Sequence, residues 1–175
     1  RARPVAGTQL LCDKIEKTRR AILVEKNNWP DILQSLQDMR KRLAVSKPQK
    51  SSWDFKNGPG GIQDIELMAQ AIGLYRQCYK TSIREQIISG MEDGHFIEED
   101  LKYLIQSYTL LTKGRILHRL MCVAEGRISE IGTGGKLRLE QIINLEPSEV
   151  FDEVILGIRE RCADIIINLL TKSKR

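Results

Sequence analysis

One glycine-rich stretch, followed by two acids, is the part of this sequence whose residue types could do chemistry. Lys56 precedes Gly60 and Gly61, and Asp64 and Glu66 come directly after them. If these glycines lead straight into a helix, free backbone N–H groups, the helix dipole and the Lys56 ammonium together favour an anion. That anion could be a phosphate or a carboxylate of a neighbouring domain. The alternative interpretation is a loop that needs its glycines only to turn and pack.

The two acids superficially match the metal-binding pattern of nucleotidyltransferases, in which a glycine pair precedes two carboxylates one residue apart. That chemistry needs both carboxylates on a β-strand, where alternate residues share a face. The stretch from Ile62 instead has helical periodicity, and residues two apart on a helix point about 200° from each other. The chain also contains no D-x-D motif. We therefore expect no catalytic residue and no metal ligand here.

The helical interpretation also assigns the polar residues to faces. Asp64 is predicted to point to the solvated side, whereas Glu66 lies at the margin of the apolar stripe, one turn from Gln70. An acid at the edge of a core needs a partner, so Glu66 is the more suggestive of the two acids.

Other reactive residues lack a recognisable setting. The run from Gly132 to Lys136 has neither the spacing of a phosphate-binding loop nor its Ser or Thr. His95 is expected in an exposed turn, and His118 is expected to make a structural hydrogen bond within a helix. Four isolated cysteines indicate reduced thiols in a cytoplasmic protein rather than a zinc site, namely Cys12, Cys78, Cys122 and Cys162.

The apolar spacing that must position these groups is helical almost throughout. Apolar residues make up 41% of the chain, charged residues 29% and aromatic residues only 5%, which suits helix packing. We predict one all-α domain over residues 1–175, an antiparallel bundle of about five to seven helices. The expected helices cover residues 8–26, 30–47, 62–79, 82–93, 98–125 and 139–145, with a last one from Pro147. Residues 47–61 form a Gly/Pro-rich motif loop and residues 126–137 a flexible loop.

Composition also argues against several classes of protein. No apolar run reaches the roughly 18 residues that a membrane span needs. The net charge of +5 comes from interspersed residues rather than from one basic face with aromatic residues, so nucleic-acid binding is not expected. The chain begins at Arg1 rather than at Met, and we expect it to be a fragment of a longer polypeptide.

Three ordered landmarks resemble one known family, bacterial glutamine synthetase adenylyltransferase. Its signature, W-D-[hydrophobic]-K-x-G-x-G-G-[IL]-x-[DE]-[IV]-E-F-x-x-Q, is matched by the chain from Trp53 to Gln70, with Leu67 in place of Phe. The start, Arg1 to Gly7, is similar to the R-A-R-x-V-A-G stretch that follows the second, C-terminal nucleotidyltransferase domain of that family. Leu117-His118-Arg119-Leu120 is similar to its E-H-R-L motif, without the acid.

The resemblance implies a helical region behind a catalytic domain that attaches AMP from ATP, with Mg²⁺, to a tyrosine of glutamine synthetase. ATP and Mg²⁺ would serve the parent enzyme, and none is firmly expected in the fragment, which should be inactive alone. The resemblance implies as partners the fragment's own nucleotidyltransferase domain, glutamine synthetase and a PII signal protein. Contact with the nucleotide or the catalytic domain falls to Lys56, Gly60 and Gly61, supported by Glu66 and Gln70.

Three alternative functions stay open. The chain could be a pure docking module for glutamine synthetase or a PII protein, with a purely structural glycine loop. A stand-alone small enzyme would have to turn over ATP by itself. A basic helical nucleic-acid binder would bind DNA in a salt-sensitive way.

Overall fold

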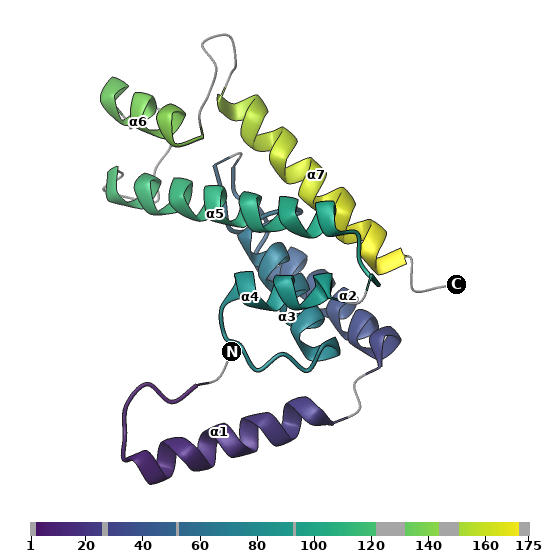
Figure 1. Ribbon diagram of the computed structural model, residues 1–175. Coiled ribbons are helices and arrows are strands. Elements are labelled where there is room, and N and C mark those ends of the chain that lie inside the picture. The colour runs from purple at the N-terminus through teal and green to yellow at the C-terminus, as the bar shows by residue number, and fades with distance from the viewer. Residues whose placement is uncertain are drawn as a thin grey trace.

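The computed structural model describes residues 3–25, 28–51, 53–92, 94–121, 132–143 and 151–171. Within these ranges every regular element is a helix (Figure 1). The elements are α1 (Gln9–Val24), α2 (Trp29–Ser46), α3 (Ile62–Tyr75), α4 (Ile83–Ile88), the short 3-10 helix η1 (Ser89–Met91), α5 (Glu98–Met121), α6 (Thr133–Ile143) and α7 (Phe151–Thr171). The predicted all-α bundle is confirmed. None of these described helices is both long and apolar enough to cross a membrane.

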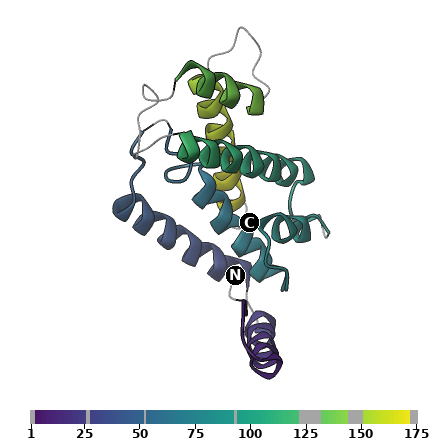
Figure 2. The same ribbon diagram turned by 90° about the vertical axis from the view of Figure 1, so that its left-hand side faces the viewer.

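Helix α3 is the centre of the bundle. It contacts α2, α4, α5 and α7, and in Figure 2 it lies between α2 and α5. Its inward residues Ile65, Met68, Ala69 and Ile72 are fully buried. Because a helix that is buried on several sides must be apolar over most of its surface, α3 is the most apolar of the described helices.

The start of α2 is fixed by its cap and by aromatic packing. The Asn28 side chain accepts a hydrogen bond from the Asp31 backbone N–H at 2.9 Å, and Pro30 lies in the first turn, one residue after the observed start of the helix. The Trp29 ring packs 5.1 Å from Tyr75 and 5.2 Å from Phe96, between ring centroids. These contacts fasten α2 to the end of α3 and to the turn before α5.

The predicted end of the third helix, at Tyr79, is wrong, because α3 ends at Tyr75. The next residues form a Schellman turn, in which the Cys78 N–H donates to the Gly73 carbonyl at 2.8 Å and the Gln77 N–H to the Leu74 carbonyl at 3.1 Å. Gln77 has a φ of 51°, a conformation that normally favours glycine. Because no glycine occurs at this position, the sequence pattern did not predict this helix end.

The predicted flexible loop over residues 126–137 is also wrong in the part that the structure describes. Helix α6 begins at Thr133, so Gly134 and Gly135 lie in its first turn. Each glycine disfavours a helix by about 1 kcal/mol relative to Ala, but α6 packs against α5, and tertiary packing outweighs propensity. Cys122, residues 126–131 and the predicted helix start at Pro147 lie outside the described residues.

Gly114 of α5 leaves room for the Phe55 ring, since a Cβ there would lie 3.2 Å from it. Leu120, near the end of α5, is 77% exposed. At the start of α4, the Ser82 side chain caps the helix by accepting from the Glu85 N–H at 3.2 Å.

Two leucines of α5 test this description of the core. Leu104 is fully buried and Leu120 is 77% exposed. Leu104→Ala should lower the free energy of unfolding by about 2–5 kcal/mol, because it leaves a cavity, whereas Leu120→Ala should change it by less than about 0.5 kcal/mol. Urea unfolding followed by circular dichroism measures both, and equal losses would contradict the assigned core.

Candidate functional site

The motif loop, residues 47–61, is organised around the Asp54 carboxylate. Its oxygens accept from the backbone N–H groups of Asn57 at 3.0 Å, Lys56 at 3.2 Å and Lys50 at 3.3 Å, and from the Asn57 amide at 2.9 Å. Burial by itself raises the pKa of Asp54, but these hydrogen bonds outweigh it, so the pKa lies below its usual value. Asp54 therefore acts as an ionised turn-former rather than as an acid or base.

The start of α3 does not offer the free N–H groups on which the predicted anion site depends, so that premise is wrong. The loop's own carbonyls accept these hydrogens: Gly61 N–H donates to Gly58 at 3.2 Å, Ile62 N–H to Phe55 at 3.0 Å and Gln63 N–H to Lys56 at 3.0 Å. The loop folds back over the helix start and takes the position that a phosphate would need.

The prediction that Asp64 faces solvent is wrong as well. Asp64 is only 8% exposed and forms a two-pronged ion pair with Arg40 of α2, with N···O distances of 2.7 and 2.8 Å. It also accepts from the Gly60 N–H at 3.0 Å. Its side chain points toward α2, a neighbour that periodicity within α3 cannot reveal.

Arg159, on α7, holds the motif loop from the other side. It is 3% exposed. Its guanidinium donates to the carbonyls of Asp54 at 2.8 Å, Asn57 at 2.7 Å and Pro59 at 3.3 Å, and to the Gln49 side chain at 3.1 Å. Burial lowers the pKa of Arg159, against the opposing charges of Asp54 and Asp64, but a guanidinium stays protonated in proteins.

Gly60 is required where the loop meets α7. It has a φ of 64°, and a Cβ built on it would lie 1.9 Å from the Arg159 carbonyl oxygen. Gly61 is similarly tight, with a Cβ 2.8 Å from the Lys56 carbonyl oxygen. Both glycines are buried and allow close backbone contact.

Aromatic side chains anchor the loop between α5 and α7. The Trp53 ring stacks on Phe151, with centroids 4.4 Å apart, and its Nε1–H donates to Asp152 at 2.6 Å. His118 packs against Trp53 and Phe55, at 6.0 and 6.2 Å. The structural hydrogen bond expected of His118 is not found at its buried Nε2, which has no partner in the described part of the chain.

The structure separates the five residues proposed from the sequence. Gly60 and Gly61 are buried against α7 and the loop, and Lys56 is half-buried on the loop. Glu66 accepts from the Tyr108 hydroxyl of α5 at 3.4 Å. Gln70 lies farther along α3, on the wall of a cavity that faces α1. Lys56, Gly60 and Gly61 thus stay together on the loop, whereas Glu66 contacts α5 and Gln70 lines the cavity on the α1 side.

A second group of charges lies beside the motif loop and was not predicted. A pocket of about 380 Å³, here called the loop pocket, separates the end of α2 from residues 58–63. Arg40, Lys41 and Lys47 line it, and among the described residues of its lining Asp64 is the one acid, already paired with Arg40. The sequence shows Arg40 to Arg42 as a basic cluster, but only the fold brings this cluster to the loop. Arg159 had a sequence signal too, since it interrupts the apolar stripe of α7.

These groups do not fit a magnesium ion. Among the described residues no group of three or more His, Cys, Asp or Glu side chains could hold a metal. Asp64 is occupied by Arg40 and the Gly60 N–H, and Glu66 faces Tyr108.

Comparison with known proteins supports the family resemblance that the motif indicates. Residues 33–140 match the family model described as GlnD PII-uridylyltransferase. The bifunctional glutamine synthetase adenylyltransferase/adenylyl-removing enzyme of Idiomarina loihiensis is 31% identical over 118 residues, which are 63% of this chain and 12% of that protein. The protein of the same name from Rhizobium meliloti is 39% identical over 74 residues, which are 42% of this chain and 8% of that protein.

A third such enzyme, from Hahella chejuensis, is 33% identical over 124 residues, which are 63% of this chain and 13% of that protein. The chain thus spans about an eighth or less of the length of these relatives. No solved structure matches it.

The contact between the loop and α7 can be tested with two matched glycines. Gly60 and Gly94 have φ angles of 64° and 68°, but a Cβ on Gly94 meets nothing within 4 Å. Gly94→Ala should cost about 1–2 kcal/mol for its left-handed backbone alone. Gly60→Ala should cost clearly more, above about 3 kcal/mol, because the loop must move off α7. Thermal unfolding measures the difference, and equal losses would contradict the close contact.

The guanidinium of Arg159 should be irreplaceable. Arg159→Lys should lower the free energy of unfolding by about 3 kcal/mol, because an ammonium cannot serve carbonyls spread over the loop and leaves several unpaired. Arg161→Ala is the control: this exposed side chain lies 4.0 Å from the Tyr103 ring centroid and should cost about 1 kcal/mol or less. Full stability of the Arg159→Lys variant would show that the loop is held by other contacts.

Proposed function

We propose that this chain, which belongs to the GlnD PII-uridylyltransferase family, is a non-catalytic helical domain that assists nucleotide transfer onto a protein. Its relatives' names make the adenylyltransferase of glutamine synthetase the favoured parent. In that case the domain helps ATP, glutamine synthetase or both to bind while AMP is attached to a tyrosine. The parent enzyme would use ATP with Mg²⁺ in the cytoplasm.

A supporting role, rather than catalysis, is favoured because the polar groups of the motif are already engaged in hydrogen bonds and ion pairs. Asp64 binds Arg40, Asp54 shapes the loop, and the N–H groups at the start of α3 donate within the loop. Groups that are already paired cannot also bind a metal or move a proton without breaking these contacts. The metal ligands of the transfer reaction would then belong to a separate catalytic domain.

The single observation behind a nucleotide role is the charge of the loop pocket. Lys41 and Lys47 line it, and Lys41 is 76% exposed with only a 3.9 Å ion pair to Asp38. Because the loop's N–H groups are engaged, contact with phosphates would fall to lysine ammonium groups, which bind phosphate as point charges. Lys56, half-buried on the same loop, is the further candidate.

In this proposal the other motif residues act through structure. Gly60 and Gly61 set the shape of the loop against α7. Glu66 ties α3 to α5 through Tyr108. Together they would keep the loop pocket in place beside the catalytic domain.

A pure docking module for glutamine synthetase or a PII protein is the second candidate function. Helix α1 favours it, because this helix has no buried residue and exposes Leu10, Leu11 and Ile22. Exposed apolar side chains on one helix are typical of a surface that another protein covers.

The two functions are separated by lysine variants in the complete polypeptide that contains this chain. Lys56→Ala and the double variant Lys41→Ala with Lys47→Ala are compared with Lys113→Ala, an exposed lysine of α5. A nucleotide role predicts that the KM for ATP rises about tenfold in the double variant, two ammonium contacts being lost, while the affinity for glutamine synthetase is unchanged.

The opposite outcome, weaker binding of glutamine synthetase with an unchanged KM for ATP, would favour docking. The isolated 175-residue chain serves as the blank. We expect it to show no turnover with ATP and Mg²⁺, and AMP transfer by this chain alone would contradict a non-catalytic domain.

A further inference from the structure

A large cavity lies far from the motif loop, between α1 and the α3–α4 region. Its volume is about 530 Å³, and we call it the α1 cavity. Ile15, Ile22 and Leu23 of α1 form one wall, and Leu74 and Gly73 of α3 form the other. Small-molecule sites in proteins are mostly apolar clefts of roughly 300–1,000 Å³, so both the size and the walls of the cavity fit such a site.

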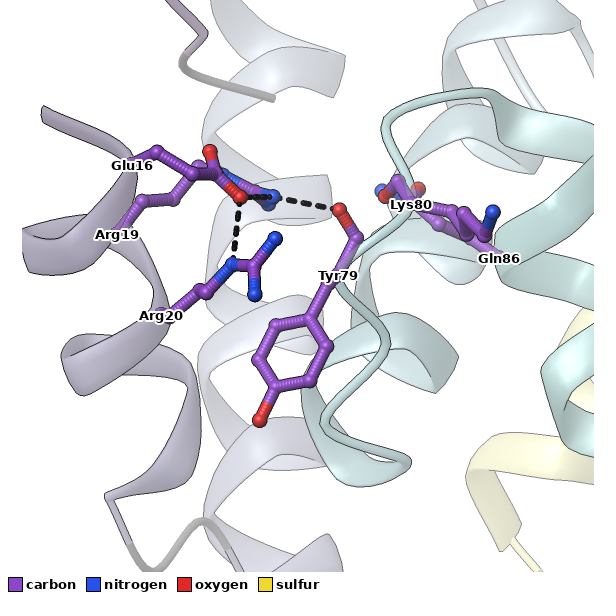
Figure 3. Close-up of polar contacts among 6 residues, drawn as sticks. All are labelled: Glu16, Arg19, Arg20, Tyr79, Lys80 and Gln86. Atoms are coloured by element: carbon purple, nitrogen blue, oxygen red, sulfur yellow. Dashed lines mark hydrogen bonds and ion pairs between the residues drawn. The ribbon is translucent and has the colours of Figure 1, made fainter. Parts of the chain in front are cut away.

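Two contacts join α1 to Tyr79, in the segment between α3 and α4 (Figure 3). The Arg19 guanidinium donates to the Tyr79 carbonyl at 2.6 Å, and the Arg20 guanidinium lies 5.3 Å from the Tyr79 ring centroid. Glu16 accepts from Arg19 at 2.7 Å and from Arg20 at 2.9 Å. The two contacts to Tyr79 join α1 to the segment that follows α3, whereas Glu16 pairs with both arginines within α1.

The bridging charges persist in mild acid. Hydrogen bonds from Arg19, and then from Arg20, lower the pKa of Glu16 from 4.5 to about 2. A carboxylate with a lowered pKa stabilises the folded state above its ordinary pKa and loses this effect as the pH falls toward the folded value. Glu16 therefore keeps its charge, and its pairs with Arg19 and Arg20 within α1, above about pH 4.5 and loses them as the pH falls toward about 2.

The charges of the residues that line the cavity indicate whether its ligand would be neutral or anionic. Lys14, Arg19 and Lys80 line it, and none of the described residues that line it is Asp or Glu. Arg19 is already paired with Glu16, and Lys80 has only a 3.8 Å contact to Glu85, both side chains being largely exposed. An apolar ligand without charge would leave these ammonium groups unmatched, whereas an anionic group would pair with them.

A buried carboxamide adds a second requirement. Gln86 lines the cavity and is 6% exposed. Its Nε2 donates to the Lys80 carbonyl at 3.1 Å, while its Oε1 is buried and has no hydrogen-bond partner among the described residues. Since an unpaired buried acceptor is costly, a ligand that brings an N–H or O–H donor to this wall gains a hydrogen bond.

We propose that the α1 cavity binds a small amphipathic anion. Its apolar body would pack between α1 and α3, its carboxylate, sulfonate or phosphate would pair with Lys14 and Lys80, and a donor would reach Gln86. This site is separate from the loop pocket and does not rest on the proposed function.

A matched pair of fluorescent probes tests the proposal on the 175-residue chain. Anilinonaphthalene sulfonate has an apolar body, an N–H donor and an anionic group, and N-phenyl-1-naphthylamine is the same molecule without the sulfonate. The sulfonate probe should bind the chain about tenfold more tightly than the neutral probe, as expected for two ammonium contacts.

Three variants locate the binding. Thr18→Trp, which places a large ring in the cavity from an exposed position of α1, should abolish binding of both probes. The double variant Lys14→Ala with Lys80→Ala should remove the preference for the sulfonate. The control, Lys17→Ala with Lys113→Ala, removes two exposed lysines that do not line the cavity and should change nothing.

Two half-buried thiols give a readout that does not depend on fluorescence. Cys78 lines the cavity, whereas Cys12 does not. Saturating sulfonate probe should slow alkylation of Cys78 about tenfold and leave Cys12 unchanged, as measured by peptide mass spectrometry.

Several results would overturn the proposal. Equal binding of the two probes, binding that survives Thr18→Trp, or loss of sulfonate preference in the control pair would mean nonspecific adsorption. Protection of Cys78 that rises with protein concentration in the absence of probe would assign the cavity to a second copy of the chain instead. Circular dichroism confirms that the variants are folded, and the lysine pair decides the matter if Thr18→Trp is not.

Discussion

The structure depends on one buried cation. The motif loop contains no regular element, so its inward carbonyls at Asp54, Asn57 and Pro59 need partners that neither a helix nor a strand supplies. The Arg159 guanidinium offers several donors in one rigid plane and satisfies them together. Because the loop is fixed in this way, it can cover the start of α3 and set the direction of the helix that every other part of the core packs against. The glycines follow from the same constraint, since only a backbone without Cβ can approach α7 so closely.

The motif shows how the same residue types can serve either chemistry or architecture. A glycine pair, a lysine and two nearby acids are what an anion or metal site would need. Here Asp64 neutralises Arg40 and accepts the Gly60 N–H, which joins α2, the loop and α3 at one point. A buried carboxylate with both a cation and a backbone donor is well satisfied, and it gives the junction a defined geometry. The cations that stay accessible lie beside the loop, on α2, rather than within it.

Features of the fold that depend on neighbouring residues could be predicted from the sequence, whereas features that depend on contacts between distant segments could not. Apolar periodicity is a local signal, and it predicted the helices and the starts of α3 and α5 correctly. The end of α3 failed because Gln77 adopts a left-handed conformation without the glycine that signals it. The prediction for Asp64 was wrong, and no role was predicted for Arg159, for a different reason: their partners lie in other segments of the chain, which the periodicity of one helix cannot show. The sequence therefore identified the segment that carries the candidate site. It could not predict that the residues of this segment contact α2, α7 and the α1 side separately.

The separation in sequence between Arg159 and the loop also affects how the chain becomes ordered during its synthesis. Pro59 and Arg159 are 100 residues apart. At ribosomal speeds of about 5–20 residues per second, the loop waits for roughly 5–20 seconds before its guanidinium partner has been made. During that interval the carbonyls can bind only water, and the Trp53 ring lacks its stacking partner Phe151. The nascent domain thus passes through a state with an incompletely covered tryptophan, the kind of surface that chaperones recognise, until α7 emerges and closes the fold.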